Sequence, residues 1–148
     1  MGISWCSFVS TLISSKSVQS VGFPIKEMFI YADDVEFTER ISKKFLCYYV
    51  FNSKVTHKTK QNLGTDIMKV SSDKLEYYFF DIRNNIYIAR KKGFLVFLKF
   101  LIYRWTLNYL FRAIKRKDSK VKAVIICIKG FFAGIFFYPK IEKGGLRK

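Results

Sequence analysis

The sequence predicts an α/β fold, because strand-like apolar runs are followed by amphipathic helical patterns. Apolar and polar residues alternate loosely over 5–13, which is typical of a β-strand, and residues 46–57 predict one or two strands that are broken near Asn52 and Ser53. Over 74–92, apolar residues recur at three- and four-residue steps, which predicts a helix. The length of 148 residues, with 16 Phe and 9 Tyr, suits a folded domain rather than a disordered chain.

The remaining elements are predicted from shorter signals. The apolar run 28–31 is strand-like and ends at two aspartates, and Asp34 or a neighbour can cap the helix that follows. The polar stretch 58–73 predicts a loop. Two apolar segments, 94–114 and 121–138, predict helices that are joined by a basic hairpin.

The basic charge is concentrated in the second half of the chain. The net charge is +16, but residues 1–82 hold 10 Lys and Arg against 9 Asp and Glu, whereas residues 83–148 hold 17 against 2. An anionic partner should therefore meet the second half. An anionic membrane surface or a diphosphate fits, and no nucleic acid is expected because no recognised nucleic-acid motif occurs. The 3 widely spaced cysteines give neither a disulfide nor a zinc pattern.

The two late apolar segments are predicted to lie at a membrane surface. The first carries Lys99, Arg104 and Arg112, and the second carries Lys129. A charge at the centre of a membrane span costs roughly 2.5–3.5 kcal/mol on insertion scales. Interfacial amphipathic helices fit better, with basic side chains at lipid phosphates and aromatic side chains among the headgroups. Packing in an ordinary core and true spanning are the alternatives.

Acidic residues are gathered in one short stretch. Five of the 11 acids lie within 27–39, and Asp33 and Asp34 stand where a strand-like run gives way to a helix. Ligands of open α/β sheets bind beyond the carboxyl ends of the strands. A carboxylate there can take a proton from an attacking hydroxyl or hold a divalent metal. The alternative is capping, because acids stabilise a helix N-terminus by about 0.3–1 kcal/mol each.

Three further side chains are candidates for binding. His57 is the only histidine, and it is either a metal ligand or a hydrogen-bonded structural residue. Arg83 and Arg90 fall on one face of the predicted 74–92 helix. Guanidinium groups suit bidentate contact with phosphate, so these two are candidates for binding a phosphate or a lipid headgroup. The alternative is a solvated basic face.

Several of these stretches together resemble the C-terminal half of bacterial family 2 glycosyltransferases, in particular the rhamnosyltransferase-like and galactofuranosyltransferase-like enzymes. The resemblance covers about residues 5–140. It is carried by the order and spacing of an acidic motif, a single histidine and a tyrosine- and arginine-containing helix. The matching pieces are SFVSTLIS, VGFPIKEMFIYADDVEFTERISKKF, NSKVTHK and YYFFDIRNNIYIARK.

The resemblance implies a GT-A fold, a Rossmann-like sheet followed by C-terminal helices. Residues 1–73 would be the acceptor side of the catalytic domain, and residues 74–148 a basic helical region associated with the membrane. Asp34 would be the general base, with Asp33 and Glu36 completing the acidic motif. His57 would contact a catalytic Mn²⁺ or Mg²⁺ held against the diphosphate of the donor.

The implied reaction is an inverting sugar transfer from a UDP-sugar or dTDP-sugar to a lipid-linked or polysaccharide acceptor. It would serve cell-surface glycan synthesis on the cytoplasmic face of a bacterial membrane, with the protein bound peripherally. No D-x-D motif of the donor-binding half occurs in the sequence. We therefore expect a C-terminal fragment that is inactive without a donor-binding half, and a separate chain that supplies this half in trans is a candidate partner. The alternative is an inactive remnant that acts as a membrane-surface or interaction protein.

Overall fold

The structure is helical rather than α/β. The computed structural model describes residues 1–58 and 66–143, and these contain no β-strand. The nearest approach to a sheet is one isolated antiparallel bridge between Gly2 and Tyr48. The predicted partial GT-A sheet is therefore wrong for the described part of the chain.

The strand-like runs fail to pair for local reasons. Within 5–13, the side chain of Ser7 accepts the N–H of Val9 at 3.4 Å, and a 3₁₀ turn, η1 (Phe8–Ser10), forms instead. Side chains of this kind compete with the ladder bonds of a sheet. In the run 46–57, the aromatic and apolar side chains from Tyr48 to Phe51 are exposed. Its only described strand-like pairing is the bridge to residues 1–3, where Ile3 N–H donates to the Cys47 carbonyl at 3.0 Å and Tyr49 N–H donates to the Met1 carbonyl at 2.9 Å. One bridge without a buried face does not extend into a strand.

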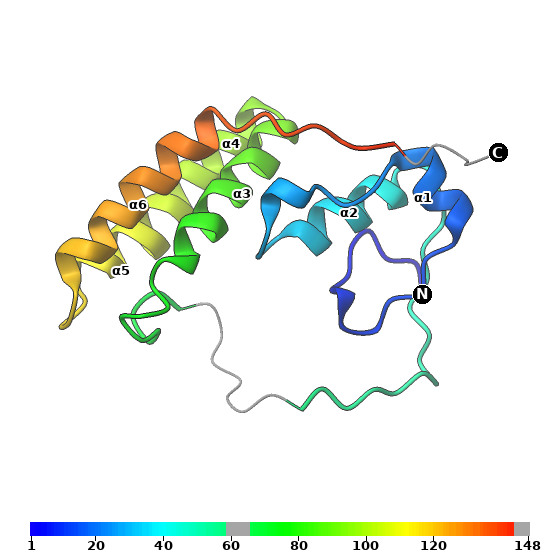
Figure 1. Ribbon diagram of the computed structural model, residues 1–148, viewed down its shortest axis with the longest axis horizontal. Coiled ribbons are helices and arrows are strands. Elements are labelled where there is room, and N and C mark those ends of the chain that lie inside the picture. Colours follow the sequence, from blue (N-terminus) through cyan, green and yellow to red (C-terminus); the bar gives the residue numbers. More distant parts are fainter. Residues whose placement is uncertain (59–65, 144–148) are drawn as a thin grey trace. The chain divides into compact units, whose positions relative to one another are not determined.

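The chain divides into two compact units: unit 1 comprises Met1–Lys60 and Pro139–Lys148, and unit 2 comprises Gln61–Tyr138. The described helices of unit 1 are short (Figure 1). They are α1 (Ser15–Val21), the 3₁₀ turn η2 (Lys26–Met28) and α2 (Asp33–Ser42). The predicted assignment of residues 1–73 and 74–148 to separate functional regions stays a prediction.

Unit 1 is held by contacts between α1 and α2. Their buried residues Val21, Phe37 and Ile41 form a small apolar cluster. The N–H of Phe23 donates to the carbonyl of Glu142 at 2.8 Å, which ties the chain near its C-terminal end to the turn after α1. Gly22 makes this possible, because its φ is +87° and a Cβ there would lie 2.8 Å from the Glu142 carbonyl oxygen.

Unit 2 consists of three helical rods that lie side by side (Figure 1). The first is α3 (Tyr77–Lys91) and the last is α6 (Lys120–Ile135). The middle rod runs from Phe94 to Ile114 without a break. Its segments are α4 (Phe94–Lys99), the π-helix η3 (Phe100–Leu110) and α5 (Phe111–Ile114). The helices predicted near 74–92, 94–114 and 121–138 are thus confirmed.

Two glycines let α6 approach α3 closely. Gly130 and Gly134 stand four residues apart and face Ile82 and Ile86, which are fully buried. A Cβ on Gly134 would lie 2.7 Å from the Ile86 Cβ and 2.9 Å from the backbone oxygen of Arg83. Small residues at this spacing bring two helix backbones together. The same interface buries Cys127, whose pKa is raised to about 12 by burial.

A buried arginine holds the turn before α6. The side chain of Arg116 donates to the carbonyl oxygens of Ile67, Val70 and Asp118, the last two at 3.0 and 3.1 Å. It also forms an ion pair with the Asp118 carboxylate at 2.8 Å. The guanidinium thereby joins the segment that precedes α3 to the α5–α6 turn.

Large apolar side chains are exposed on unit 2, and together they form what we call the apolar surface. The members on the middle rod and on α6 are Phe94, Leu95, Leu98, Ile102, Leu107, Phe111, Val121, Ile125, Ile128 and Phe132. The middle rod is long and apolar enough to cross a membrane by length and composition alone, and it is hardly buried. The same rod also contributes Tyr109 and Ala113 to the core of unit 2, so its exposed apolar side chains lie beside a packed face. Membrane-surface binding, packing in an ordinary core and spanning stay alternatives.

Candidate functional site

The acids of α2 follow a strained turn rather than a strand. The run 28–31 begins at the end of η2, and Phe29, Tyr31 and Ala32 have φ of 62°, 66° and 61°. Each such non-glycine residue costs about 1–3 kcal/mol, and strain of this kind concentrates at functional sites. The expected placement of the acids beyond a strand end is therefore wrong, but they do begin a helix.

Asp34 lies in the first turn of α2 and is half-buried. One carboxylate oxygen, Oδ1, accepts the N–H of Val35 at 2.8 Å within the first turn, while the N-cap position is Ala32, which makes no side-chain capping bond. Among the described residues, the carboxylate forms no ion pair with a basic side chain. Its negative charge is thus not neutralised by such a partner, and the hydrogen bond from Val35 uses only one of its two oxygens.

Asp33 precedes Asp34 and is also half-buried. Burial raises the pKa of Asp33, and the neighbouring charge of Asp34 raises it further, while backbone N–H groups act in the opposite direction. Asp33 can therefore keep its proton at a higher pH than an ordinary aspartate. The two adjacent acids form a pair in which one member has a pKa set by its surroundings, an arrangement that occurs often at acid–base sites.

Glu36 differs from the two aspartates because it is buried in an ion pair. Its carboxylate accepts hydrogen bonds from Arg40 Nε at 3.1 Å and from Arg40 Nη2 at 2.9 Å. Arg40 also donates to the carbonyl oxygens of Val21 and Phe23, at 2.5 and 3.0 Å. These bonds fix α2 against the end of α1. We therefore regard Glu36 as a positioning residue for the acidic turn.

His57 is exposed in an extended segment near the end of the first described range. In the ranges 1–58 and 66–143, no group of three or more His, Cys, Asp or Glu side chains is placed to hold a metal ion. The described residues therefore supply no further donors of this kind beside His57, and we derive no step through a metal. The role of His57 as a metal ligand stays a prediction.

Arg83 and Arg90 both have packing partners within unit 2. The Arg83 guanidinium lies 4.2 Å from the ring centre of Phe137 and also contacts two phenylalanines of α3. Arg90 donates to the carbonyl oxygen of Gly134 at 2.9 Å, near the C-terminal end of α6, and stacks on Tyr138. A cation at a helix C-terminus stabilises it. Binding of phosphate or lipid by these two residues stays a prediction.

The sequence reasoning missed a buried acid in unit 2. Asp81, on α3, accepts a hydrogen bond from the Tyr109 hydroxyl at 2.7 Å and another from the Asn85 amide at 2.7 Å. Arg104 Nε lies 3.4 Å from the same tyrosine oxygen. Burial raises the pKa of Asp81, against the opposing effect of these partners. The only signal in the sequence was an acid within an apolar helical pattern.

We expect Asp81 to make unit 2 less stable as the pH rises. Its pKa is above 3.8 in the folded chain, so the folded state holds the proton more tightly than the unfolded state does. The contribution of Asp81 to the free energy of unfolding is complete below the pKa that this residue has in the unfolded chain. It is lost as the pH rises through the pKa that the residue has in the folded chain. The substitution Asp81→Asn should remove this part of the decrease in stability with rising pH. The decrease is measured as the slope of the urea unfolding midpoint plotted against pH.

A matched control for this slope is Asp73→Asn. Asp73 is exposed, and its pKa is lowered, first by a hydrogen bond from the Ser71 side chain. Its contribution to the pH dependence therefore has the opposite sign, and its removal should not flatten the fall assigned to Asp81. A wild-type chain and an Asp81→Asn chain with identical slopes would contradict the assignment.

The comparisons with known proteins assign no family to the chain. No family model, no curated protein and no solved structure matches it. The functional interpretation therefore depends on the sequence motifs and on the geometry of the residues described above.

Proposed function

We propose that the chain is the acceptor-side part of an inverting glycosyltransferase, with Asp34 as its general base. The observation that carries the proposal is the Asp34 carboxylate, which is half-buried behind a strained turn and forms no ion pair in the described part of the chain. The donor would be a UDP-sugar or a dTDP-sugar. Because the 148 residues contain no D-x-D motif, the donor site would lie on another polypeptide segment.

The proposed chemistry needs one proton transfer by the protein. The acceptor hydroxyl attacks the anomeric carbon of the donor sugar, and its proton passes to the free oxygen of Asp34. The new glycosidic bond forms as the bond to the nucleoside diphosphate breaks, and the diphosphate leaves with the bonding electrons. Asp33 would accept a hydrogen bond from an acceptor hydroxyl and so help to orient it.

The apolar surface and the basic charge of unit 2 support a location at the cytoplasmic face of a membrane. Transfer of exposed apolar side chains from water into the boundary between headgroups and acyl chains is favourable. Each basic residue near an anionic membrane adds about 1 kcal/mol. A lipid-linked or polysaccharide acceptor in cell-surface glycan synthesis would be presented at the same boundary.

The substitution Asp34→Asn tests the proposal. An asparagine oxygen can still accept the N–H of Val35, so this hydrogen bond in the first turn of α2 is kept while the base is removed. Transfer should fall on the order of a hundredfold, the lower end of the contribution of a general base. It is measured in membrane preparations that contain the chain, with radiolabelled UDP-sugars and dTDP-sugars and the endogenous acceptors.

The control is Asp73→Asn, which makes the same chemical change at an exposed acid outside the acidic motif. It should leave transfer unchanged. Near-normal transfer by Asp34→Asn would show that Asp34 is not the base. If transfer never depends on the chain while the chain stays with the membrane fraction, the non-catalytic membrane-surface protein becomes the better interpretation.

A further inference from the structure

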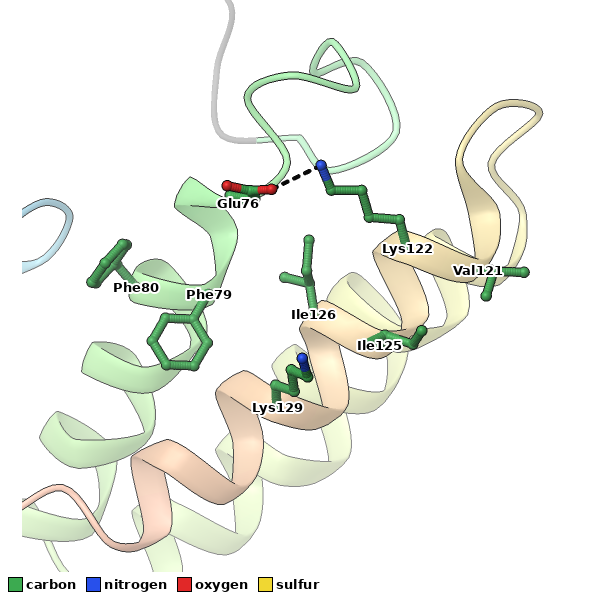
Figure 2. Close-up of a pocket in the computed structure, with 8 residues that line it drawn as sticks. All are labelled: Glu76, Phe79, Phe80, Val121, Lys122, Ile125, Ile126 and Lys129. Atoms are coloured by element: carbon green, nitrogen blue, oxygen red, sulfur yellow. Dashed lines mark ion pairs between the residues drawn. The ribbon is translucent and has the colours of Figure 1, made fainter.

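A groove on unit 2 lies between the start of α3 and the N-terminal half of α6 (Figure 2). Its volume is about 570 Å³, and it is open to solvent. Figure 2 shows two aromatic rings from α3 on one side and apolar and basic side chains from α6 on the other. The lining residues are Glu76, Phe79, Phe80, Val121, Lys122, Ile125, Ile126 and Lys129.

The walls of the groove are mainly apolar. Phe79 and Ile126 are largely buried and pack into the core of unit 2. Val121 and Ile125 are 72% and 45% exposed, and both belong to the apolar surface as well as to the groove. A hydrocarbon chain could therefore pass from the apolar surface into the groove without crossing a polar barrier. Such walls favour an apolar ligand and do not suit a small free anion alone.

The charged residues of the groove carry a net positive charge. Lys122 pairs with Glu76 at 3.0 Å, but the two side chains are 44% and 74% exposed, so this ion pair is weak. Lys129 is exposed at the groove and forms no ion pair with any residue that the structure describes. A phosphate could take Lys129 directly and compete for Lys122.

We propose that this groove binds the phosphate and the first part of the hydrocarbon chain of a lipid phosphate. The phosphate would lie at Lys129 and Lys122, and the chain would lie against Phe79, Ile125 and Val121. This inference rests on the proposed function, because it identifies the lipid-linked acceptor as the ligand of unit 2. A groove with apolar walls and an unneutralised lysine matches a ligand that is apolar at one end and anionic at the other.

The binding test uses the full chain and three soluble probes. Geranyl phosphate should bind in titration calorimetry, and both geraniol and inorganic phosphate should bind at least about tenfold more weakly. Lys129→Gln should weaken geranyl phosphate binding about tenfold, the loss expected for one hydrogen bond to a charged group. Ile125→Trp should fill the groove and weaken binding by at least as much.

Two matched variants separate the groove from general effects of charge and bulk. Lys120→Gln removes an exposed lysine of α6 that does not line the groove, and Ile128→Trp enlarges an equally exposed isoleucine outside it. Both should bind geranyl phosphate as the wild type does. Circular dichroism establishes that each variant is folded, and Lys129→Arg, which keeps the charge, should retain most of the binding.

Each outcome either supports or overturns the proposal. Inorganic phosphate binding as tightly as geranyl phosphate would mean a simple anion site. Geraniol binding as tightly would mean an apolar groove without phosphate recognition. Equal losses in Lys120→Gln and Lys129→Gln would mean attraction by general charge. Asp34→Asn should bind geranyl phosphate normally, so failure of the groove and failure of the proposed base are distinguishable.

Discussion

Replacing Gly134 with leucine is expected to prevent unit 2 from folding. The Cβ alone would lie 2.7 Å from the Cβ of Ile86 and 2.9 Å from the carbonyl oxygen of Arg83. Neither atom is the end of a flexible side chain, so α6 would have to move away from α3. Overpacking costs about 1–3 kcal/mol even where a core can adjust, and here a whole helix interface separates. The helix content by circular dichroism should fall markedly.

The control for Gly134→Leu is Phe132→Leu, two residues earlier on the same helix. Phe132 is 57% exposed, so leucine there meets no close neighbour and the helix content should be unchanged. Gly134→Ala should be intermediate, because the gain of about 1 kcal/mol in helix propensity offsets part of the clash. A Gly134→Leu chain that unfolds at the wild-type urea midpoint would contradict the close approach of the two helices.

Replacing Arg116 with alanine is expected to lower the free energy of unfolding of unit 2 by about 3 kcal/mol. The guanidinium is almost wholly buried, and its loss leaves the carbonyl oxygens of Ile67 and Val70 without this donor. Asp118 loses its ion pair as well, although that carboxylate is exposed enough to be hydrated. Urea unfolding followed by circular dichroism measures the change.

Two further variants separate the role of the Arg116 guanidinium from the effect of its charge alone. Lys117→Ala removes an exposed neighbouring charge and should shift the unfolding free energy by no more than about 0.5 kcal/mol. Arg116→Lys keeps the charge but has no planar fork of donors, so it should recover only part of the stability. If Arg116→Ala and Lys117→Ala were equally stable, the buried guanidinium would not hold the turn.

The helices of unit 2 could be predicted because their apolar periodicity is fulfilled within the same unit. The positions that repeat along 74–92 include Leu75, Ile82 and Ile86, and all three are fully buried. The strands could not be predicted correctly, because the apolar patterns at 5–13 and 46–57 lead to a strand only where a partner strand and a buried face are present. Among the described residues the pairing stops at one isolated bridge, between Gly2 and Tyr48, and a local hydrogen bond from Val9 N–H to the Ser7 side chain forms within 5–13 instead.

The candidate site was partly predictable. Asp33 and Asp34 at the start of a helix follow from the local sequence, and so does the pairing of Glu36 with Arg40, one helical turn later. The contact between Asp81 and Tyr109 could not be found in this way, since it joins residues 28 positions apart on different helices. The positive φ angles of Phe29 and Tyr31 also could not be predicted from the sequence, because neither residue type favours this backbone conformation.

Because Cys127 is buried, its reactivity can be used to measure how often the core of unit 2 opens. A thiol whose pKa is near 12 is almost entirely protonated at neutral pH, and the thiolate is the form that alkylating reagents attack. This residue is also fully buried in the apolar core that the helices of unit 2 share. Alkylation of Cys127 should therefore proceed only through transient opening of that core, and its rate would measure how often the core opens.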